Sequence, residues 1–476
     1  MKKIFLTLSI FSLIASCSDD FVDIKQEGVT VGTDFFKTED DAMRATNAIY
    51  SFLRSWENSG FPAQFVFGVT GDDVEKGSNP GDASFINAYD NFSFTISDDG
   101  VNGYWTGQWQ AVQRTNQVIT NVPNIDMDAN LKNRLIAEAK MLRAYFYFNL
   151  VRIYGGVPIF DGLKSQTDYL NTPRNTAAEV YAFIVKDLTE ASEVLPQSYG
   201  AADVGRVTKG GALGLLSKVY LYMKDYQKAY DTSNLVIGMG YALEPDFNKL
   251  FRPAGEFGSE SVFEVNCGCS PEFGGSQYAE VQGVRNQFGW GFFTPTQALE
   301  DAFEPGDVRK EFTILREGET TLEGDLIKKG DPQAGNTWNQ KVYVPTSLNN
   351  NACGYGSIQN IRILRFADIL LINAEAANEL GNTGVAITNI NKVRERAKLG
   401  ITPASTQTAL RLAIWQERRV ELAMEMDRFP DLVRTGQAAQ YLGPLGFETG
   451  KNELFPIPLR AITDGKGILT QNPGYN

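Results

Sequence analysis

Apolar residues recur at intervals of three and four along most of the chain, and this spacing predicts a mainly α-helical protein. The pattern is strongest in segments long enough for several helical turns, which are residues 39–56, 104–121, 131–154, 176–195, 208–223, 225–237, 363–380, 385–398 and 406–426. Two stretches between them, residues 60–103 and 241–360, are weakly patterned and rich in Gly, Asn and Asp. Because loops of that length in a compact chain are usually functional or disordered, we expect irregular insertions beside the helices.

Two helix pairs share a spacing that indicates internal repeats. Ser217 and Ala229 lie twelve residues apart, and so do Ala374 and Ala386. The tetratricopeptide pattern has small residues at this separation, where they let two antiparallel helices approach closely. Such pairs must stack to bury their faces. Residues 39–56 with 104–121, and 131–154 with 176–195, supply two more pairs, so we expect about four tetratricopeptide-like pairs and a binding surface in preference to a catalyst.

The N-terminus has the features of an export signal. Lys2 and Lys3 precede an apolar run, residues 4–15, that is too short for the ~20 residues of a membrane-spanning helix. The run ends at Ile14-Ala15-Ser16-Cys17, which resembles the lipobox of bacterial lipoproteins, and Ser18-Asp19-Asp20 resembles an export tag of some Bacteroidetes lipoproteins. We expect residues 1–16 to be removed, Cys17 to carry the lipid, residues 17–38 to form a tether, and residues 39–476 to form one domain.

Composition narrows the possible functions. The 476 residues are 43% hydrophobic and carry a formal charge of −13, which favours a folded protein and argues against a nucleic-acid partner. The chain contains no histidine, so the usual serine and cysteine triads, imidazole zinc sites and the commonest general base are excluded. After Cys17, the odd set Cys267, Cys269 and Cys353 allows at most one disulfide. Inert or locally paired cysteines are favoured over a metal site.

Several stretches together resemble the SusD/RagB family of outer-membrane lipoproteins. They include "EAKMLRAYFYFNLVRIYGGVPIF", "ILRFADILLINAEAANELG" and "ERRVELAMEMDRFPDLVRTG", and the full set covers residues 138–160, 173–196, 205–229, 295–310, 363–381, 417–436 and the C-terminal "LFPIP" and "LTQNPGY". The resemblance implies four tetratricopeptide-like pairs, with an irregular remainder that carries the ligand surface. It also implies capture of a nutrient, most often a polysaccharide fragment, and delivery to a SusC-like TonB-dependent transporter, with no cofactor.

Glycan recognition needs an aromatic ring for the apolar face of a sugar and planar polar groups for its hydroxyls, held in loops on a rigid scaffold. Two segments have this character, "GDDVEKGSNPGDASFINAYDNF" and "RNQFGWGFFTP". The candidate ligand residues are Asp72, Asp73, Asn79, Asn87, Tyr89, Arg285, Asn286, Gln287, Trp290 and Trp338. Trp290 is the leading candidate platform, because Gly289 and Gly291 flank it. A neutral glycan is favoured by the net charge, although Arg285 or Lys76 could add a local cationic contact.

Other charged and aromatic residues have structural interpretations. Spacing along one helix predicts exposed ion pairs, each contributing ~0.3–0.5 kcal/mol, among Glu417, Arg418, Arg419, Glu421, Glu425 and Arg428. Asp187, Glu375 and Arg365 are likewise expected to pack and pair within helices, and the aromatic run at residues 145–148 is expected to be buried.

Two alternatives to glycan capture remain open. A glycosidase needs two carboxylates and no histidine, so Asp72 or Asp73 with Glu75 is conceivable, but three carboxylates in a Gly-rich loop are more often solvated or, at most, a calcium site. Some relatives resemble RagB-like lipoproteins that capture peptides, and the same loops could bind an oligopeptide.

Overall fold

The computed structural model of the chain describes residues 35–270, 274–287, 289–328, 335–348, 353 and 356–475. The expected signal peptide, Cys17 and most of the expected tether lie outside these residues. The described part is mainly helical, as predicted. The long helices are α3 (Glu39–Leu53), α7 (Asp99–Asn121), α8 (Ala129–Tyr154), α10 (Ala177–Val194), α11 (Lys209–Tyr222), α12 (Tyr226–Ile237), α17 (Phe366–Glu379), α18 (Thr383–Arg396) and α19 (Gln407–Glu421).

Side-chain caps explain where several of these helices begin. Thr38 before α3 and Thr176 before α10 each form a capping box with the acidic residue three positions later, Asp41 and Glu179. The Thr208 side chain accepts a hydrogen bond from the backbone N–H of Gly211 at the start of α11. These caps satisfy backbone donors that have no partner within the helix, so they fix each starting residue.

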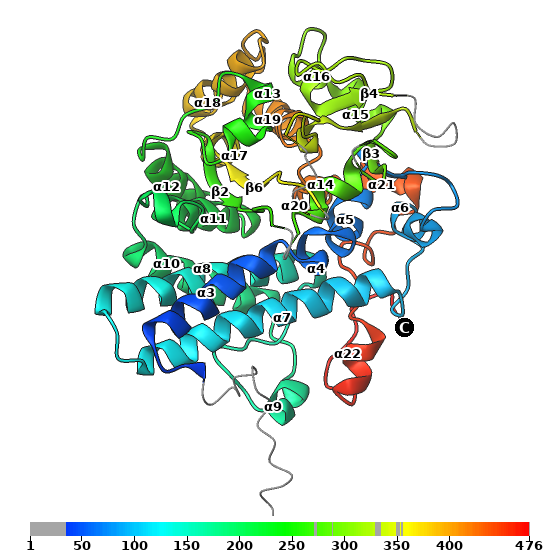
Figure 1. Cartoon of the computed structure of the whole chain (residues 1–476). Helices are drawn as coiled ribbons and strands as arrows, with labels where there is room; N and C mark the ends of the chain where they lie inside the picture. Colours follow the sequence, from blue (N-terminus) through cyan, green and yellow to red (C-terminus); the bar gives the residue numbers. More distant parts are fainter. Residues whose placement is uncertain are drawn as a thin grey trace, which may run out of the picture.

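The long helices stack as antiparallel pairs in the predicted order. Helix α3 packs on α7, α8 on α10, α11 on α12, and α17 on α18, while contacts of α7 with α8, α10 with α11, and α12 with α17 join one pair to the next. Figure 1 shows this stack running from α3 and α7 to α17, α18 and α19. The small residues Ser217, Ala229, Ala374 and Ala386 are fully buried in it. The tetratricopeptide-like scaffold is therefore confirmed.

Shorter elements fill the regions expected to be irregular. The short helices are α4 (Trp56–Ser59), α5 (Phe61–Gln64), the π-helix η2 (Phe65–Val69), α6 (Asn87–Asp90), α9 (Gln166–Asn171), α13 (Phe247–Leu250), α14 (Gln277–Gln282), α15 (Gln297–Ala302), α16 (Arg309–Thr313), α20 (Arg428–Thr435), α21 (Ala438–Leu442) and α22 (Leu459–Asp464). Single 3₁₀ turns, from η3 (Ser84–Ile86) to η8 (Gly443–Leu445), connect some of them.

The strands of the described residues form antiparallel pairs. Strand β1 (Val74–Gly77) pairs with β3 (Phe292–Pro295), β2 (Ser261–Val265) with β6 (Ile361–Arg365), and β4 (Ile314–Arg316) with β5 (Thr337–Asn339). The helical pattern predicted a helix from residue 363, but residues 361–365 are extended because they pair with β2, and α17 begins only at Phe366.

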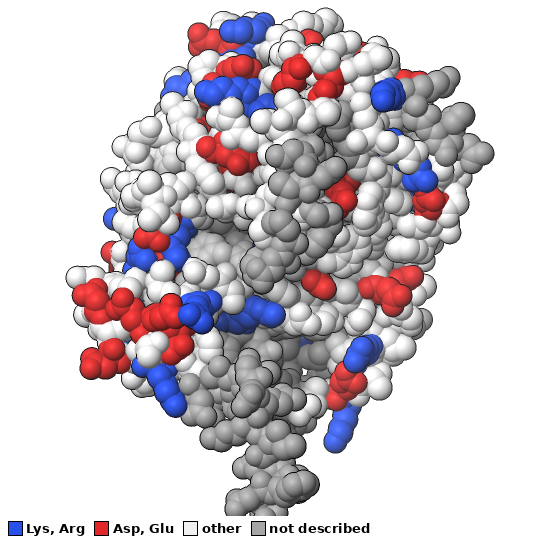
Figure 2. All heavy atoms as spheres, in the orientation of Figure 1, with Lys and Arg blue, Asp and Glu red and all other residues white. Residues whose placement is uncertain are grey.

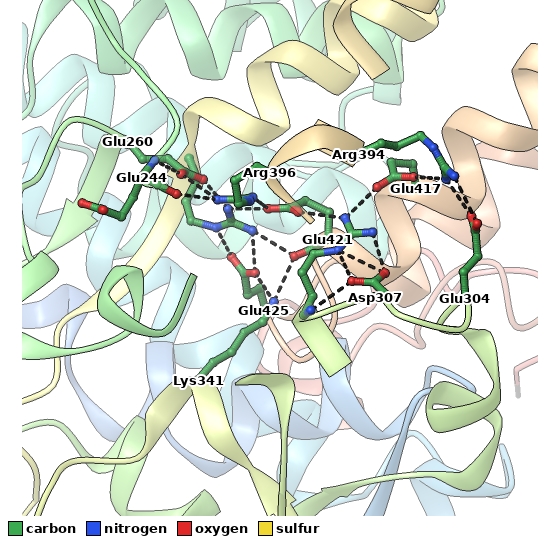
Figure 3. Close-up of polar contacts among 12 residues, drawn as sticks. Glu244, Glu260, Glu304, Asp307, Lys341, Arg394, Arg396, Glu417, Glu421 and Glu425 are labelled. Carbon is green, nitrogen blue, oxygen red and sulfur yellow. Dashed lines mark hydrogen bonds and ion pairs between the residues drawn. The ribbon is translucent and has the colours of Figure 1, made fainter. Parts of the chain in front are cut away.

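A buried network of charges joins the end of the helical stack to the irregular region (Figure 3). Glu421 of α19 accepts hydrogen bonds from Arg309 of α16, Arg365 of β6 and Arg396 of α18. The Glu421 side chain is fully buried, and despite burial the surrounding cations hold its pKa well below the usual range. The expectation of exposed pairs along one helix is wrong for the whole set. The six residues are largely buried and pair with residues of other elements; they are Glu417, Arg418, Arg419, Glu421, Glu425 and Arg428. Glu421 nevertheless has a structural role, as expected, because it joins several elements of the fold.

Other expectations for the interior hold. Phe146, Tyr147 and Phe148 are buried in the core, as their position on all sides of α8 predicted. Asp187 pairs with Arg143 inside the scaffold. The structure also resolves the cysteine pairing, because Cys269 and Cys353 form a disulfide and Cys267 is a buried free thiol. None of the described helices has the length and apolar character needed to cross a membrane.

Candidate functional site

The pairing of β1 with β3 brings together the two loop segments that the sequence analysis selected. Val74 lies opposite Pro295, and Gly77 lies opposite Phe292, so the chain after β1 and the chain before β3 leave the ladder at the same end. The Ser78 N–H donates to the Gly291 carbonyl at 2.6 Å, which extends the contact beyond the ladder. Figure 1 shows β3, α5 and α6 grouped on one side of the molecule. Segments about 200 residues apart in sequence therefore share one surface.

A buried ion cluster anchors the start of β1. Arg428 donates to both carboxylate oxygens of Asp72, from Nε at 2.7 Å and from Nη2 at 3.0 Å. Arg419 donates to Asp73, which is 1% exposed. The ring of Tyr441 lies against both guanidinium groups. Asp72 and Asp73 were predicted as ligand residues, but their carboxylates are buried and already paired with arginines. Their role is therefore to support the site structurally.

The two carboxyls respond differently to this environment. Burial acts to raise the pKa of Asp72, but the hydrogen bond and charge of Arg428 outweigh it, and the pKa lies below its ordinary value. Burial raises the pKa of Asp73 above its ordinary value, although Arg428 and Arg419 oppose the shift. Both carboxyls are buried and paired with arginines, which argues against either as a member of the glycosidase pair considered from the sequence.

Trp290 forms an aromatic surface at the junction of the two segments. Its side chain is 37% exposed, and its other parts pack against Trp56, with centroids 6.1 Å apart, and Phe61, at 5.7 Å. The Trp290 N–H donates to the Glu280 carbonyl at 3.0 Å, and the Trp290 carbonyl accepts from the Ser78 hydroxyl at 3.0 Å. The indole is thus fixed by its backbone and by neighbouring rings, with part of the ring open to solvent.

The glycines beside Trp290 permit this close packing. A side chain at position 289 would place its Cβ 2.0 Å from the Glu280 carbonyl oxygen, and Gly291 has φ +77°, in the left-handed region that glycine favours. The sequence analysis expected these glycines to let the indole project from a loop. The structure gives them a second role, because they also let the loop lie directly against α14.

A second exposed aromatic residue was missed in the sequence. Phe85 lies within the first candidate segment and is 51% exposed. Its ring packs edge-on against Phe65, which in turn contacts Phe61 and so reaches Trp290. Both exposed rings therefore rest on one aromatic cluster built by α5 and η2. The signal available in the sequence was a large apolar residue inside a Gly-, Asn- and Asp-rich loop.

Polar groups around Trp290 are held by the loop that follows β1. Arg285 donates to the Ser78 hydroxyl at 2.7 Å and pairs with Asp82 at 2.5 Å. The Lys76 ammonium donates to the carbonyls of Gly77, Asn79 and Asp82, and its side chain is buried. Lys76 therefore closes the loop and is not a cationic contact for a ligand. Arg285 is partly exposed, and its Nη1 makes the contacts with both Ser78 and Asp82.

The other candidates divide into exposed and internally bonded residues. Asn286 and Asn87 are exposed, and Asn79 is half-buried on the loop after β1. The amide of Gln287 is used within the protein: it donates to the Leu326 carbonyl and accepts from the Lys328 N–H. Gln287 thus connects the loop to residues 326–328, which argues against its predicted role in binding ligand.

The prediction that Tyr89 and Trp338 contact ligand is wrong, because both rings are buried. Tyr89 is fully buried, stacked between Phe65 and Phe94, and its hydroxyl accepts from the Val101 N–H. Trp338 is 1% exposed, in a small apolar cluster with Val284 and Leu315. Neither ring can cover a ligand in this structure. Sequence alone does not show whether an aromatic residue in a polar loop is exposed or buried, because the loop can fold back over the core.

Two acidic groups of the first candidate segment influence each other. Asp90 at the end of α6 has a pKa raised to about 6, first by burial and then by the nearby charge of Glu75, which is exposed. On the face drawn in Figure 2, acidic and basic side chains are interspersed among broad uncharged areas. Among the residues that the structure describes, no group of three or more Asp, Glu or Cys side chains is arranged to hold a metal ion.

Comparisons with known proteins agree with this architecture. A family model described as "SusD family" matches residues 260–475, and one described as "Starch-binding associating with outer membrane" matches residues 66–221. SusD-like protein P2 of Formosa agariphila is 29% identical over 518 aligned positions, covering all of both chains.

Solved structures are similar over nearly the whole chain. A laminarin-binding SusD-like protein is 31% identical with a TM-score of 0.79, covering 92% of this chain and 100% of that one. Surface glycan-binding protein A from Bacteroides fluxus is 26% identical with a TM-score of 0.78, covering 92% of this chain and 100% of that one. From these matches and from the paired-helix scaffold, the chain belongs to the SusD-like family.

Proposed function

We propose that this protein captures a neutral oligosaccharide or polysaccharide on the surface around Trp290 and delivers it to a SusC-like TonB-dependent transporter. The observation that carries the proposal is the indole of Trp290, which is fixed by its backbone and by Trp56 yet remains 37% exposed. A rigid, partly exposed indole has an apolar face that suits the C–H groups of a sugar ring.

The rim around the indole suits sugar hydroxyls. Arg285 is a donor fixed by Asp82 and Ser78, and Asn286 is an exposed amide that both donates and accepts. Phe85 provides a second exposed ring on the same aromatic cluster. Two rings separated by a polar rim match an extended chain of sugars better than a single small molecule.

The relatives narrow the first ligands to test. The SusD-like protein at 31% identity is named as laminarin-binding, and laminarin is an uncharged glucan. A neutral ligand also agrees with the formal charge of −13 on this chain, which would repel sulfated or uronate polymers. Laminarihexaose is therefore the first probe, with maltohexaose, cellohexaose and xylohexaose as the comparison set.

The transport step of the proposal requires a partner. The lipid on Cys17 would tether the mature chain to the outer membrane, facing the cell exterior. A tethered binder raises the local concentration of its ligand, but translocation needs a channel, and the family resemblance indicates a TonB-dependent transporter of the SusC kind. Capture at the surface and passage through that partner are thus separate steps that experiments can distinguish.

The function is tested by binding and uptake in the native cell. Purified protein should bind at least one of the four hexasaccharides, and a strain lacking this gene should take up that sugar more slowly, while gentle detergent extraction of the wild type should co-purify the transporter. Binding of oligopeptides with none of the sugars bound would overturn glycan capture in favour of a peptide-capturing role. Recovery of this protein only as a monomer, from cells that express the SusC-like transporter, would contradict a stable complex.

A further inference from the structure

We infer that the protein has a second sugar site, separate from the Trp290 surface, in a pocket bounded by α7, α9 and α22. The inference rests on the proposed glycan function for the class of ligand. The pocket has a volume of about 300 Å³ and shares none of its lining residues with the surface around Trp290. Figure 1 shows α9 and α22 below α7, whereas β3 and α6 lie higher in the view.

Aromatic side chains form the wall of this pocket. Trp105 and Trp109 lie one turn apart on α7, with ring centroids 5.4 Å apart. Phe160 packs against Trp109 at 5.4 Å and against Tyr169 of α9 at 4.5 Å. The row of rings is left partly open, because Trp109 and Tyr169 are half-buried and the adjacent Leu170 is exposed. The pocket is therefore a second aromatic surface, built on α7 and on the segment from Phe160 to α9.

Two hydrogen-bond donors at the pocket lack partners. The Trp109 Nε1–H and the Tyr169 hydroxyl are buried, and neither has a hydrogen-bond partner among the described residues. Leaving a buried donor unpaired costs about 1–3 kcal/mol, so an acceptor held in the pocket would recover this cost.

The remaining lining indicates which molecule would supply that acceptor. Gln110 and Gln113 present exposed amides on the outer turn of α7, and Asp464 of α22 is exposed at the rim. The described lining contains no Lys or Arg. The cation beside the rim, Arg460, already pairs with Asp464 at 3.6 Å, which disfavours a phosphate or a carboxylate as the ligand. An uncharged ring with an apolar face and several hydroxyls satisfies the aromatic wall, the two donors and the amides together. These features describe a sugar of a neutral glycan.

The second site is tested by fluorine NMR of the full chain labelled with 5-fluorotryptophan. The chain has six tryptophans, and Trp109→Phe and Trp290→Phe variants assign the two signals of interest. Addition of laminarihexaose, or of whichever hexasaccharide of the comparison set binds, should shift the Trp109 and Trp290 signals. The Trp338 signal is the internal control and should stay in place, because that indole is buried elsewhere with its Nε1–H also unpaired.

Variants separate the two sites. In Trp290→Ala the Trp109 signal should still respond to the sugar, and in Tyr169→Phe the half-saturation concentration for the Trp109 signal should rise about fivefold or more while that for Trp290 stays unchanged. A response at Trp290 with none at Trp109 would overturn the second site and leave the proposed function standing. A response at Trp109 with none at Trp290 would support the second site and show that the sugar does not bind at the Trp290 surface.

Two further outcomes would overturn the inference. If the Trp109 signal moves when the purified transporter is added and never with a sugar, the pocket is a protein-docking surface. If Tyr169→Phe weakens the Trp109 and Trp290 responses equally, the Tyr169 hydroxyl stabilises the fold and does not contact the ligand.

Discussion

Arg428 forms a two-pronged hydrogen bond with Asp72, from Nε to Oδ1 at 2.7 Å and from Nη2 to Oδ2 at 3.0 Å, and so joins α20 to the residues that precede β1. The pair is buried, and the Asp73 carboxylate lies beside it. The backbone carbonyls of Asp72 and Asp73 also accept hydrogen bonds from Thr296, which follows β3. Both strands of the candidate site therefore depend on this one cluster.

Removal of the Arg428 charge should destabilise the protein strongly. In Arg428→Met, Asp72 and Asp73 lose one of the two arginines that they share, while Arg419 stays paired with both. Because one cation remains, the loss should be at the lower end of the range for breaking a buried pair, about 3 kcal/mol. The loss of unfolding free energy, measured with urea, should be larger at pH 8 than at pH 5. At the lower pH, protonation removes part of the unpaired negative charge of the two carboxylates.

Arg460→Met is the matched control. Arg460 lies on α22, is mostly exposed and pairs with Asp464 at 3.6 Å, so its removal should change stability by less than about 1 kcal/mol. Equal effects of the two substitutions would show that the Asp72 cluster does not support the fold.

Asp90 should make stability depend on pH. Because its folded-state pKa is raised to about 6 by burial and by Glu75, the folded protein holds this proton more tightly than the unfolded chain does. The associated stability is present at low pH and is lost as the pH rises from about 4 through 6. Asp90→Asn, which stays uncharged, should therefore have a higher melting temperature than the wild type at pH 8 and a similar one at pH 4. Asp126→Asn, at an exposed position, is the control, and a pH-independent effect of Asp90→Asn would contradict the account.

Cys17 should determine the location of the protein. If the apolar run and Ser16 direct acylation, Cys17→Ala should shift the protein from the membrane fraction to the soluble fraction, whereas the neighbouring Ser18→Ala should stay with the membrane. Protease added to intact cells should digest the wild type. Retention of Cys17→Ala in salt-washed outer membranes would contradict the lipid anchor.

The protein should bind oligosaccharide without cutting it. The chain has no histidine, and the carboxylates first considered for a glycosidase, Asp72 and Asp73, are occupied by Arg428 and Arg419. Chromatography after a long incubation with laminarihexaose should therefore recover the intact sugar. Shorter products that disappear in Asp73→Asn would favour a glycosidase instead.

The helical scaffold could be predicted because it depends on local information. Apolar spacing gives the faces of the helices, Thr and Asp caps fix where several of them begin, and small residues such as Ser217 and Ala374 mark where helices approach. Each of these signals is read within about a dozen residues. The β6 segment was misassigned because its conformation depends on pairing with β2, about 100 residues earlier.

The candidate site was predicted only in part, because side-chain positions depend on contacts that are distant in the sequence. The composition of the loops selected two segments that the pairing of β1 with β3 brings together, but the position of each side chain depends on distant partners. Asp73 meets Arg419 across 346 residues, and Gln287 meets the backbone of residues 326–328. Tyr89 and Trp290 occupy similar polar loops, yet the first is stacked inside the core and the second is exposed. No local pattern separates these outcomes.

Calorimetric titration of Trp290→Ala with laminarihexaose, or with whichever neutral hexasaccharide binds the wild type, tests the central claim most directly. If the exposed indole is the ligand platform, affinity should fall by ~2 kcal/mol or more, about 30-fold, with little change in melting temperature. Trp338→Ala is the contrasting variant: it removes a buried ring, should cost ~3–5 kcal/mol of stability, and should leave the affinity of the remaining folded protein unchanged. Unchanged affinity in Trp290→Ala together with a lowered melting temperature would contradict the account and make Trp290 a structural residue.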